Sequence, residues 1–172
     1  DEAVCHLTRL FDGQELPRNR MKVGKMDLMK AADGVDQALL KTCTEHVLPR
    51  LRRFHEKQKA DSWQIEESGG STGIRVQPLN RVGLYVPGGT AFYPSTLMMT
   101  LVPAQVAGVK EIAVFTPPGA LEKSPILAAL LLELKVEEIY RVGGAQAVAA
   151  AAIGTPTIAR CDKLVGPGNL FV

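Results

Sequence analysis

The stretch Arg81-Val-Gly-Leu-Tyr-Val-Pro-Gly-Gly-Thr-Ala-Phe-Tyr-Pro-Ser-Thr96 sets the architecture of the chain. Residues 82–86 form a short apolar and aromatic run that is typical of a buried strand. The run ends in Pro87-Gly88-Gly89, where the glycines permit backbone angles closed to other residues and let a ligand approach the main chain. Pro94 and Ser95 then suit the first turn of a helix. This order of strand, glycine turn and helix is the local geometry of anion and nucleotide sites.

Three further apolar segments end in similar Gly/Pro turns. They are 112–115 before Thr116-Pro-Pro-Gly119, 138–142 before Gly143-Gly-Ala-Gln146, and 163–165 before Gly166-Pro-Gly-Asn169. The segments 96–108, 124–135 and 145–153 are predicted to be the helices that connect these strands. Strands that alternate with helices predict βαβ units and a parallel sheet. In such a sheet the four turns meet at the carboxyl ends of the strands, where ligands bind.

The first 80 residues are predicted to be mainly helical, with a short hairpin. Apolar residues recur at helical spacing in the segments 1–11, 26–34 and 35–58. Pro49 interrupts the third segment, and because a proline deep in a helix costs ~3 kcal/mol, we expect a kink or a break there. Two short strands, 63–66 and 74–76, are predicted around Gly69-Gly70. Charged residues dominate before Asn80 and apolar residues after it, which predicts a boundary between a helical N-terminal region, residues 1–80, and an α/β region, residues 81–172.

Composition restricts the class of protein. The chain has 172 residues, 46% hydrophobic and 22% charged, as in ordinary globular proteins. Its net charge of +2 is too small to indicate a nucleic-acid partner. The longest apolar run, 126–132, is too short to cross a bilayer, and no signal peptide is visible. Three widely spaced cysteines favour a reducing compartment, so we expect a cytoplasmic protein without a membrane partner.

Three side chains are candidates for contact with a ligand. Gln146 and Asn169 each follow a glycine turn at a predicted helix start, where an amide can donate and accept hydrogen bonds toward a ligand. Either amide could instead cap its helix or close its turn. Tyr85 ends the first strand, where its hydroxyl could reach the ligand edge or simply lie in the core. The dinucleotide fingerprint G-x-G-x-x-G is incomplete, because Gly166-Pro-Gly168 lacks its third glycine.

The sequence offers neither a catalytic group nor a metal site. No nucleophile elbow and no paired carboxylates stand at a strand end, so we assign no catalytic residue. Cys43 and His46 are spaced i, i+3, and Cys5 with His6 could complete a set of four ligands. Nothing in the sequence brings these two segments together, so we assign no metal ligand.

The glycine turns resemble those of the L-histidinol dehydrogenase family. The resemblance is carried by residues 82–91 with 94–96, by 142–150 and by 162–169, which occur in the family's order, and it extends over essentially the whole chain. It implies an incomplete Rossmann-like parallel sheet flanked by helices, similar to aldehyde dehydrogenases, with a helical N-terminal region. Residues 81–172 would then be the NAD-binding region, truncated at its C-terminus. Tyr85, Gln146 and Asn169 fall on the family positions that contact NAD.

The resemblance also implies an activity and partners. The family contains zinc and oxidises L-histidinol to L-histidine through L-histidinal, with two hydride transfers to NAD, and it forms intertwined homodimers. Its zinc ligands and its Glu-His acid/base pair lie downstream of the Gly-Pro-Gly-Asn motif, whereas this chain ends three residues after Asn169. The chain starts without methionine and ends in apolar residues, so we expect a fragment that does not oxidise histidinol alone. The alternatives are a related enzyme for another alcohol, such as a sulfonated diol, and a non-catalytic binding or dimerisation module.

Overall fold

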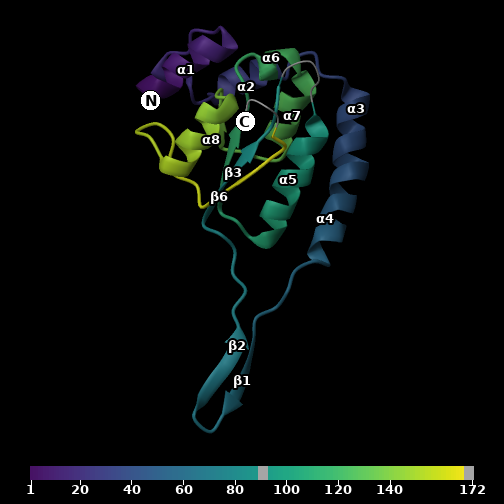
Figure 1. The fold of residues 1–172 in the computed structure, drawn as a ribbon. Helices are drawn as coiled ribbons and strands as arrows, with labels where there is room; N and C mark the ends of the chain where they lie inside the picture. Colours follow the sequence, from purple (N-terminus) through teal and green to yellow (C-terminus); the bar gives the residue numbers. More distant parts are fainter. Residues whose placement is uncertain (89–92, 169–172) are drawn as a thin grey trace.

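The computed structural model describes residues 1–88 and 93–168 and shows an α/β body with a projecting hairpin (Figure 1). Its α-helices are α1 (Glu2–Asp12), α2 (Lys25–Ala31), α3 (Gln37–Thr42), α4 (Leu48–Glu56), α5 (Pro94–Ala107), α6 (Ala120–Lys123), α7 (Pro125–Glu133) and α8 (Gly144–Ile153). A 3-10 turn, η1 (Arg18–Arg20), and a π-helical turn, η2 (Cys43–Val47), complete the helical elements. The strands are β1 (Trp63–Glu67), β2 (Gly70–Ile74), β3 (Arg81–Tyr85), β4 (Glu111–Phe115), β5 (Glu138–Tyr140) and β6 (Lys163–Val165).

The predicted parallel sheet is confirmed. Its strand order is β5-β4-β3-β6, and every neighbouring pair is parallel. Val82 is paired with Ile112 on one side and with Lys163 on the other, so β3 is shared by the two halves. The chain moves outward from β3 through β4 to β5 and then returns to β6 on the opposite side of β3. The strand order therefore reverses between β3 and β6, which is where open α/β sheets bind ligands.

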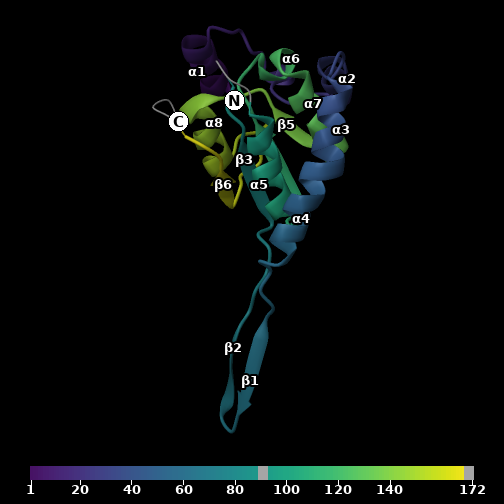
Figure 2. The same cartoon turned by 90° about the vertical axis from the view of Figure 1, so that its right-hand side faces the viewer.

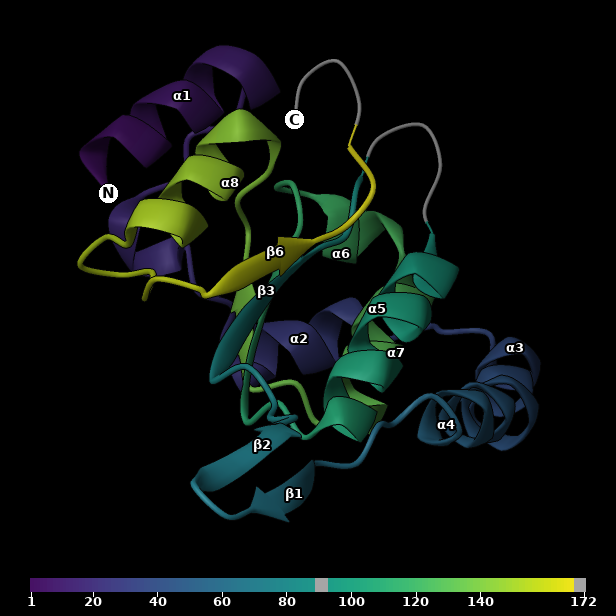
Figure 3. The same ribbon diagram turned by 60° about the horizontal axis from the view of Figure 1, so that its bottom comes forward.

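Alternating side chains of the strands separate the core into two layers, one on each face of the sheet. Val82, Leu84 and Val86 pack toward α5 and α7, whereas Tyr85 packs on the face covered by α1 and α8. Figure 3 shows these two pairs of helices on either side of β3 and β6. On the α8 face the rings of Phe115 and Tyr140 stack with centroids 5.2 Å apart. The sheet is thus covered on both faces, as parallel sheets require.

The helical N-terminal region packs on this body. The helices predicted over 1–11 and 26–34 correspond to α1 and α2, which lie against α8 and α7 respectively. Between 35 and 58 the helical path is not broken at Pro49. It passes through the π turn η2, where the Leu48 N–H donates to the Cys43 carbonyl, and Pro49 falls in the first turn of α4. The wider turn lies directly before the residue that lacks an N–H, so a local adjustment replaces the expected break. The boundary near residue 80 stays a prediction.

The predicted hairpin is present and projects away from the body (Figure 2). Strands β1 and β2 are antiparallel, with Trp63 opposite Ile74 and Glu67 opposite Gly70. The prediction placed the second strand at 74–76, but it occupies 70–74, because the chain already reverses over Ser68 and Gly69. Every residue of both strands is exposed.

In the portion of the chain that the structure describes, no helix combines the length and hydropathy needed to span a membrane.

Candidate functional site

The carboxyl ends of the four parallel strands form one edge, which we call the carboxyl rim. Of the described residues it comprises 86–88 after β3, 116–119 after β4, 141–144 after β5 and 166–168 after β6. Because the strands are parallel, these four segments leave the sheet on the same side. The sequence predicted that the four turns meet at one edge, although they are spread over about 80 residues of the chain.

Glycines allow the segments of the carboxyl rim to pack closely. A Cβ atom on Gly166 would lie 2.3 Å from the carbonyl oxygen of Tyr85, so a side chain at this position would push β6 away from β3. A Cβ atom on Gly143 would lie 2.6 Å from Cγ of Pro117. Neither distance is tolerated between non-bonded atoms, so both positions require glycine for packing.

Tyr85 connects the end of β3 to the start of α8. Its side chain is buried, and its hydroxyl oxygen accepts a hydrogen bond from the N–H of Gly144 at 3.1 Å. Burial raises the pKa of Tyr85, the Gly144 N–H opposes this shift, and the negative charge of Asp12 adds to it. The phenol is therefore neutral near pH 7 and keeps its own hydrogen for donation.

Gln146 lies in the first turn of α8 and is 5% exposed. Its Nε2 donates to Oδ2 of Asp12 at 3.3 Å. Gly144 has a φ of 64°, and a Cβ atom there would lie 2.6 Å from Oε1 of Gln146. The positive φ and the lack of space both favour glycine at 144. Partial burial raises the pKa of the Asp12 carboxyl.

Two of the three predicted ligand contacts come together. Tyr85 is hydrogen-bonded to the backbone two residues before Gln146, and Gly166 lies against Tyr85. Asn169 lies outside the described residues. Asp12 was missed by sequence reasoning, because it is 134 residues from Gln146. Its signal was weak: an acidic residue directly before the glycine that ends α1.

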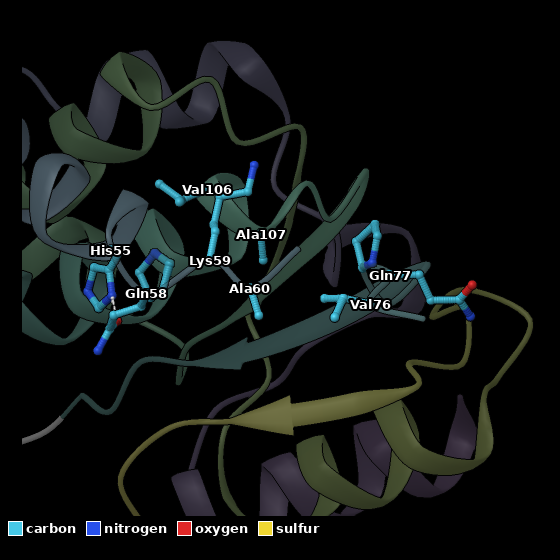
Figure 4. Close-up of a pocket in the computed structure, with 10 residues that line it drawn as sticks. His55, Gln58, Lys59, Ala60, Val76, Gln77, Val106 and Ala107 are labelled. Carbon is cyan, nitrogen blue, oxygen red and sulfur yellow. Dashed lines mark hydrogen bonds between the residues drawn. The ribbon is translucent and has the colours of Figure 1, made fainter. Parts of the chain in front are cut away.

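A cavity of about 520 Å³ lies elsewhere, near the amino-terminal edge of the sheet. It is lined by the end of α4, the segment that leads into β3 and the end of α5 (Figure 4). His55 faces it, with Nδ1 2.6 Å from Oε1 of Gln58. The cavity lies beside the base of the hairpin, far from the carboxyl ends of the strands. The carboxyl rim is the candidate ligand site, because parallel sheets bind ligands at that edge.

The metal ligands considered from the sequence are separated by the sheet. Cys43 belongs to the core layer beneath α5 and α7, whereas Cys5 packs against the layer beneath α1 and α8. Within residues 1–88 and 93–168, no three His, Cys, Asp or Glu side chains are placed to hold a metal ion. The described residues therefore do not fit a zinc site.

Comparison with known proteins gives one consistent family. The family model for histidinol dehydrogenase matches residues 1–172. The chain is 45% identical over 176 residues to the histidinol dehydrogenase of Geobacillus kaustophilus and 41% identical over 174 residues to that of Nitrosomonas europaea. Each alignment covers 100% of this chain and 40% of the relative, so the chain spans less than half of their length.

A solved structure agrees with the sequence relatives. The crystal structure of histidinol dehydrogenase from Elizabethkingia anophelis superposes with a TM-score of 0.88 at 32% identity, over 100% of this chain and 40% of that one. The predicted α/β architecture and the family resemblance are thereby confirmed together. The chain belongs to the histidinol dehydrogenase family.

Proposed function

We propose that this chain is the NAD-binding portion of an enzyme that oxidises L-histidinol to L-histidine through L-histidinal. The observation that carries the proposal is the junction of Tyr85 with the Gly144 N–H, beside Gln146, at the point where the strand order reverses. The family supplies the substrate, since the relatives that match the whole chain are histidinol dehydrogenases.

The residues of the carboxyl rim fit a dinucleotide. Glycines at 143 and 166 let the rim segments pack closely, and the start of α8 favours negative charge such as a pyrophosphate. Tyr85 would offer its hydroxyl hydrogen, and Gln146 would offer an amide oxygen. We add Asn169 to these two proposed NAD contacts, because the family resemblance implies that it contacts NAD as well. Bound NAD would supply the hydride acceptor, and the side chains of this chain would orient it.

An NAD titration tests this assignment. Calorimetry of the chain should show saturable NAD binding, and we expect Q146A and Y85F each to weaken it about tenfold, because about 1.4 kcal/mol is lost with one hydrogen bond. E15A is the matched control, because the Glu15 side chain is exposed and pairs with Arg9 of α1. No NAD binding together with a stable dimer would favour the binding or dimerisation module instead.

We further propose that zinc and the acid/base groups of the enzyme are supplied by residues outside this chain. The described residues do not fit zinc, and the chain spans 40% of the relatives' length. The chain alone is therefore expected to produce no NADH from histidinol, with or without added zinc. Zinc-dependent NADH formation by the chain would contradict this proposal. A related enzyme for another alcohol would be recognised if the full-length protein oxidised a sulfonated diol in preference to histidinol.

We also propose a cytoplasmic homodimer. Trp63, Ile65 and Ile74 lie on one face of the hairpin and are each at least 50% exposed. An isolated two-stranded hairpin is marginal in water, so its apolar face favours a partner surface. The three free cysteines among the described residues support a reducing compartment. Sedimentation should show a dimer that is weakened by I65S, and a monomer at all concentrations would argue against it.

A further inference from the structure

The end of α1 lies against the carboxyl rim, although it is distant in sequence from all four strands. Helix α1 packs on α8, and its last residue is Asp12. Two residues later, Nε2 of Gln14 donates to the carbonyl of Pro118 at 3.4 Å, in the turn after β4. Asp12 itself accepts from Gln146 at 3.3 Å. The N-terminal segment is therefore hydrogen-bonded to the rim segment after β4 and to the first turn of α8, which follows the rim segment after β5.

Asp12 occupies a position that is locally unfavourable for a carboxylate. It is half-buried, and it ends a helix, where the carbonyl groups concentrate negative charge. Among the ion pairs of the described residues, none includes Asp12. The hydrogen bond from Gln146 is thus its main compensation. A residue that conflicts with its local environment but is satisfied by a distant partner is typical of a functional position.

The hydrogen bond determines the orientation of the Gln146 amide. The two ends of an amide have almost the same shape, but the oxygen accepts and the nitrogen donates. A carboxylate only accepts, so the Gln146 NH₂ group must face Asp12. The oxygen Oε1 is then held beside Gly144, at the start of α8. A flipped amide would place two oxygen acceptors against each other.

We propose that Asp12 is a positioning residue, which fixes the Gln146 amide so that Oε1 is offered to a hydrogen-bond donor of the bound dinucleotide. This inference rests on the proposed NAD site. The donor is a ribose hydroxyl, the carboxamide NH₂ or the adenine NH₂, because an oxygen acceptor repels the pyrophosphate. Oε1 of Gln146 would therefore bind the polar groups of the nucleoside. The Gly144 N–H is bonded to Tyr85, so only the N–H groups that follow it in the first turn of α8 remain for the phosphates.

A double-mutant cycle on NAD affinity tests the coupling. The chain, D12A, Q146A and D12A/Q146A are titrated with NAD, with E15A as the control for loss of a nearby acid. We expect D12A to weaken binding about tenfold in the wild-type background and less than about twofold in the Q146A background. D12N keeps an acceptor but also gains a donor that tolerates the flipped amide, so its effect is expected to be intermediate. Additive effects of D12A and Q146A would overturn the proposal.

A second readout separates this inference from the proposed function. The side-chain NH₂ signals of Gln146 are assigned in the ¹⁵N NMR spectrum by their loss in Q146A. They are expected to shift in D12A and D12N and to stay unchanged in E15A, whether or not NAD binds. If the wild-type chain binds no NAD, the proposed function fails and these signals still decide the role of Asp12. If D12A does not fold, D12N is used in both measurements. Unchanged Gln146 signals in the Asp12 variants would overturn the inference.

Discussion

Arg81 shows how a single buried charge organises four strands. Its guanidinium is almost fully buried and pairs with Glu138 of β5 at 2.5 Å and with Glu111 of β4 at 2.9 Å. Its backbone N–H donates to Oδ2 of Asp162, directly before β6, at 3.1 Å. One residue at the start of β3 therefore links all the other strands of the sheet. It fixes their amino ends, so that their carboxyl ends meet at the carboxyl rim.

We expect R81A to lower the free energy of unfolding by about 3 kcal/mol. The substitution leaves the partly buried carboxylate of Glu138 without its charged partner, and breaking such a pair costs about 3–5 kcal/mol. The exposed Glu111 adds little. Urea denaturation measures the change, and K163A, at an exposed position on β6, serves as the control within about 0.5 kcal/mol. An R81A midpoint equal to that of wild type would show that the network does not stabilise the sheet.

The same network predicts a pH dependence with two limbs. The hydrogen bond from Arg81 lowers the pKa of Glu138 below 4.5, so its contribution is present above that value and lost as the pH falls through the lowered pKa. Burial and the charge of Glu138 raise the pKa of Tyr140 from 10.0 to about 12, so its contribution is present below pH 10 and lost as the pH rises toward 12. Unfolding free energies measured against pH should lose the acid limb in E138Q and the alkaline limb in Y140F.

Among the single residues of the candidate site, the sequence predicted two and missed a third. Tyr85 and Gln146 were predicted from glycine turns within a few residues of each, and the structure brings them together. Whether they bind NAD stays a prediction. Asp12 could not be predicted, because its role depends on the packing of α1 on α8 and not on any local pattern.

Among the helices and strands, the spacing of apolar residues predicted the elements in which such residues repeat several times. The parallel strands and the helices α5, α7 and α8 were predicted to within about two residues, because apolar residues repeat along them. The helix α6 has four residues, too few for a period, and was missed. The π turn η2 depends on a bond from Leu48 to Cys43 that no side-chain pattern records.

The junction of β3 with β6 should be sensitive to one added methyl group. In G166A the new Cβ would collide with the Tyr85 carbonyl at 2.3 Å, so the two strand ends must separate. We expect a loss of about 1–3 kcal/mol and a lower melting temperature. G24A is the matched control, because a Cβ atom there meets nothing within 4 Å. Equal melting temperatures for the two variants would refute the close approach.

At the level of the whole molecule, a packed body carries an exposed arm, which comprises residues 57–80 and includes the hairpin. The hairpin and the segments on either side of it contain only exposed residues from 57 to 80. Composition predicted a change of character near residue 80 but not that the arm would extend from the body, because a hairpin pattern says nothing about the direction in which it projects (Figure 2). The arm is the region whose local stability depends least on the core.

Limited digestion with trypsin should therefore cut the arm first. Lys59 and Arg75 are exposed and stand on either side of the hairpin. We expect early cleavage at both sites in dilute protein, with the cut fragments still associated through the packing of α1 on α8 and of α2 on α7. Mass spectrometry identifies the sites. Slower cleavage at higher protein concentration would support the dimer, and a first cut after Arg81, which is buried in β3, would contradict the described fold.

The strand order has a kinetic consequence. Strand β3 meets β4 after about 30 residues but meets β6 only after about 80. Closing the longer loop costs about 0.9 kcal/mol more entropy. The sheet is therefore expected to grow first from β3 toward β5, with β6 docking late. The amides of β6 should gain hydrogen-exchange protection last during refolding, which would make the carboxyl rim the final region of the molecule to form.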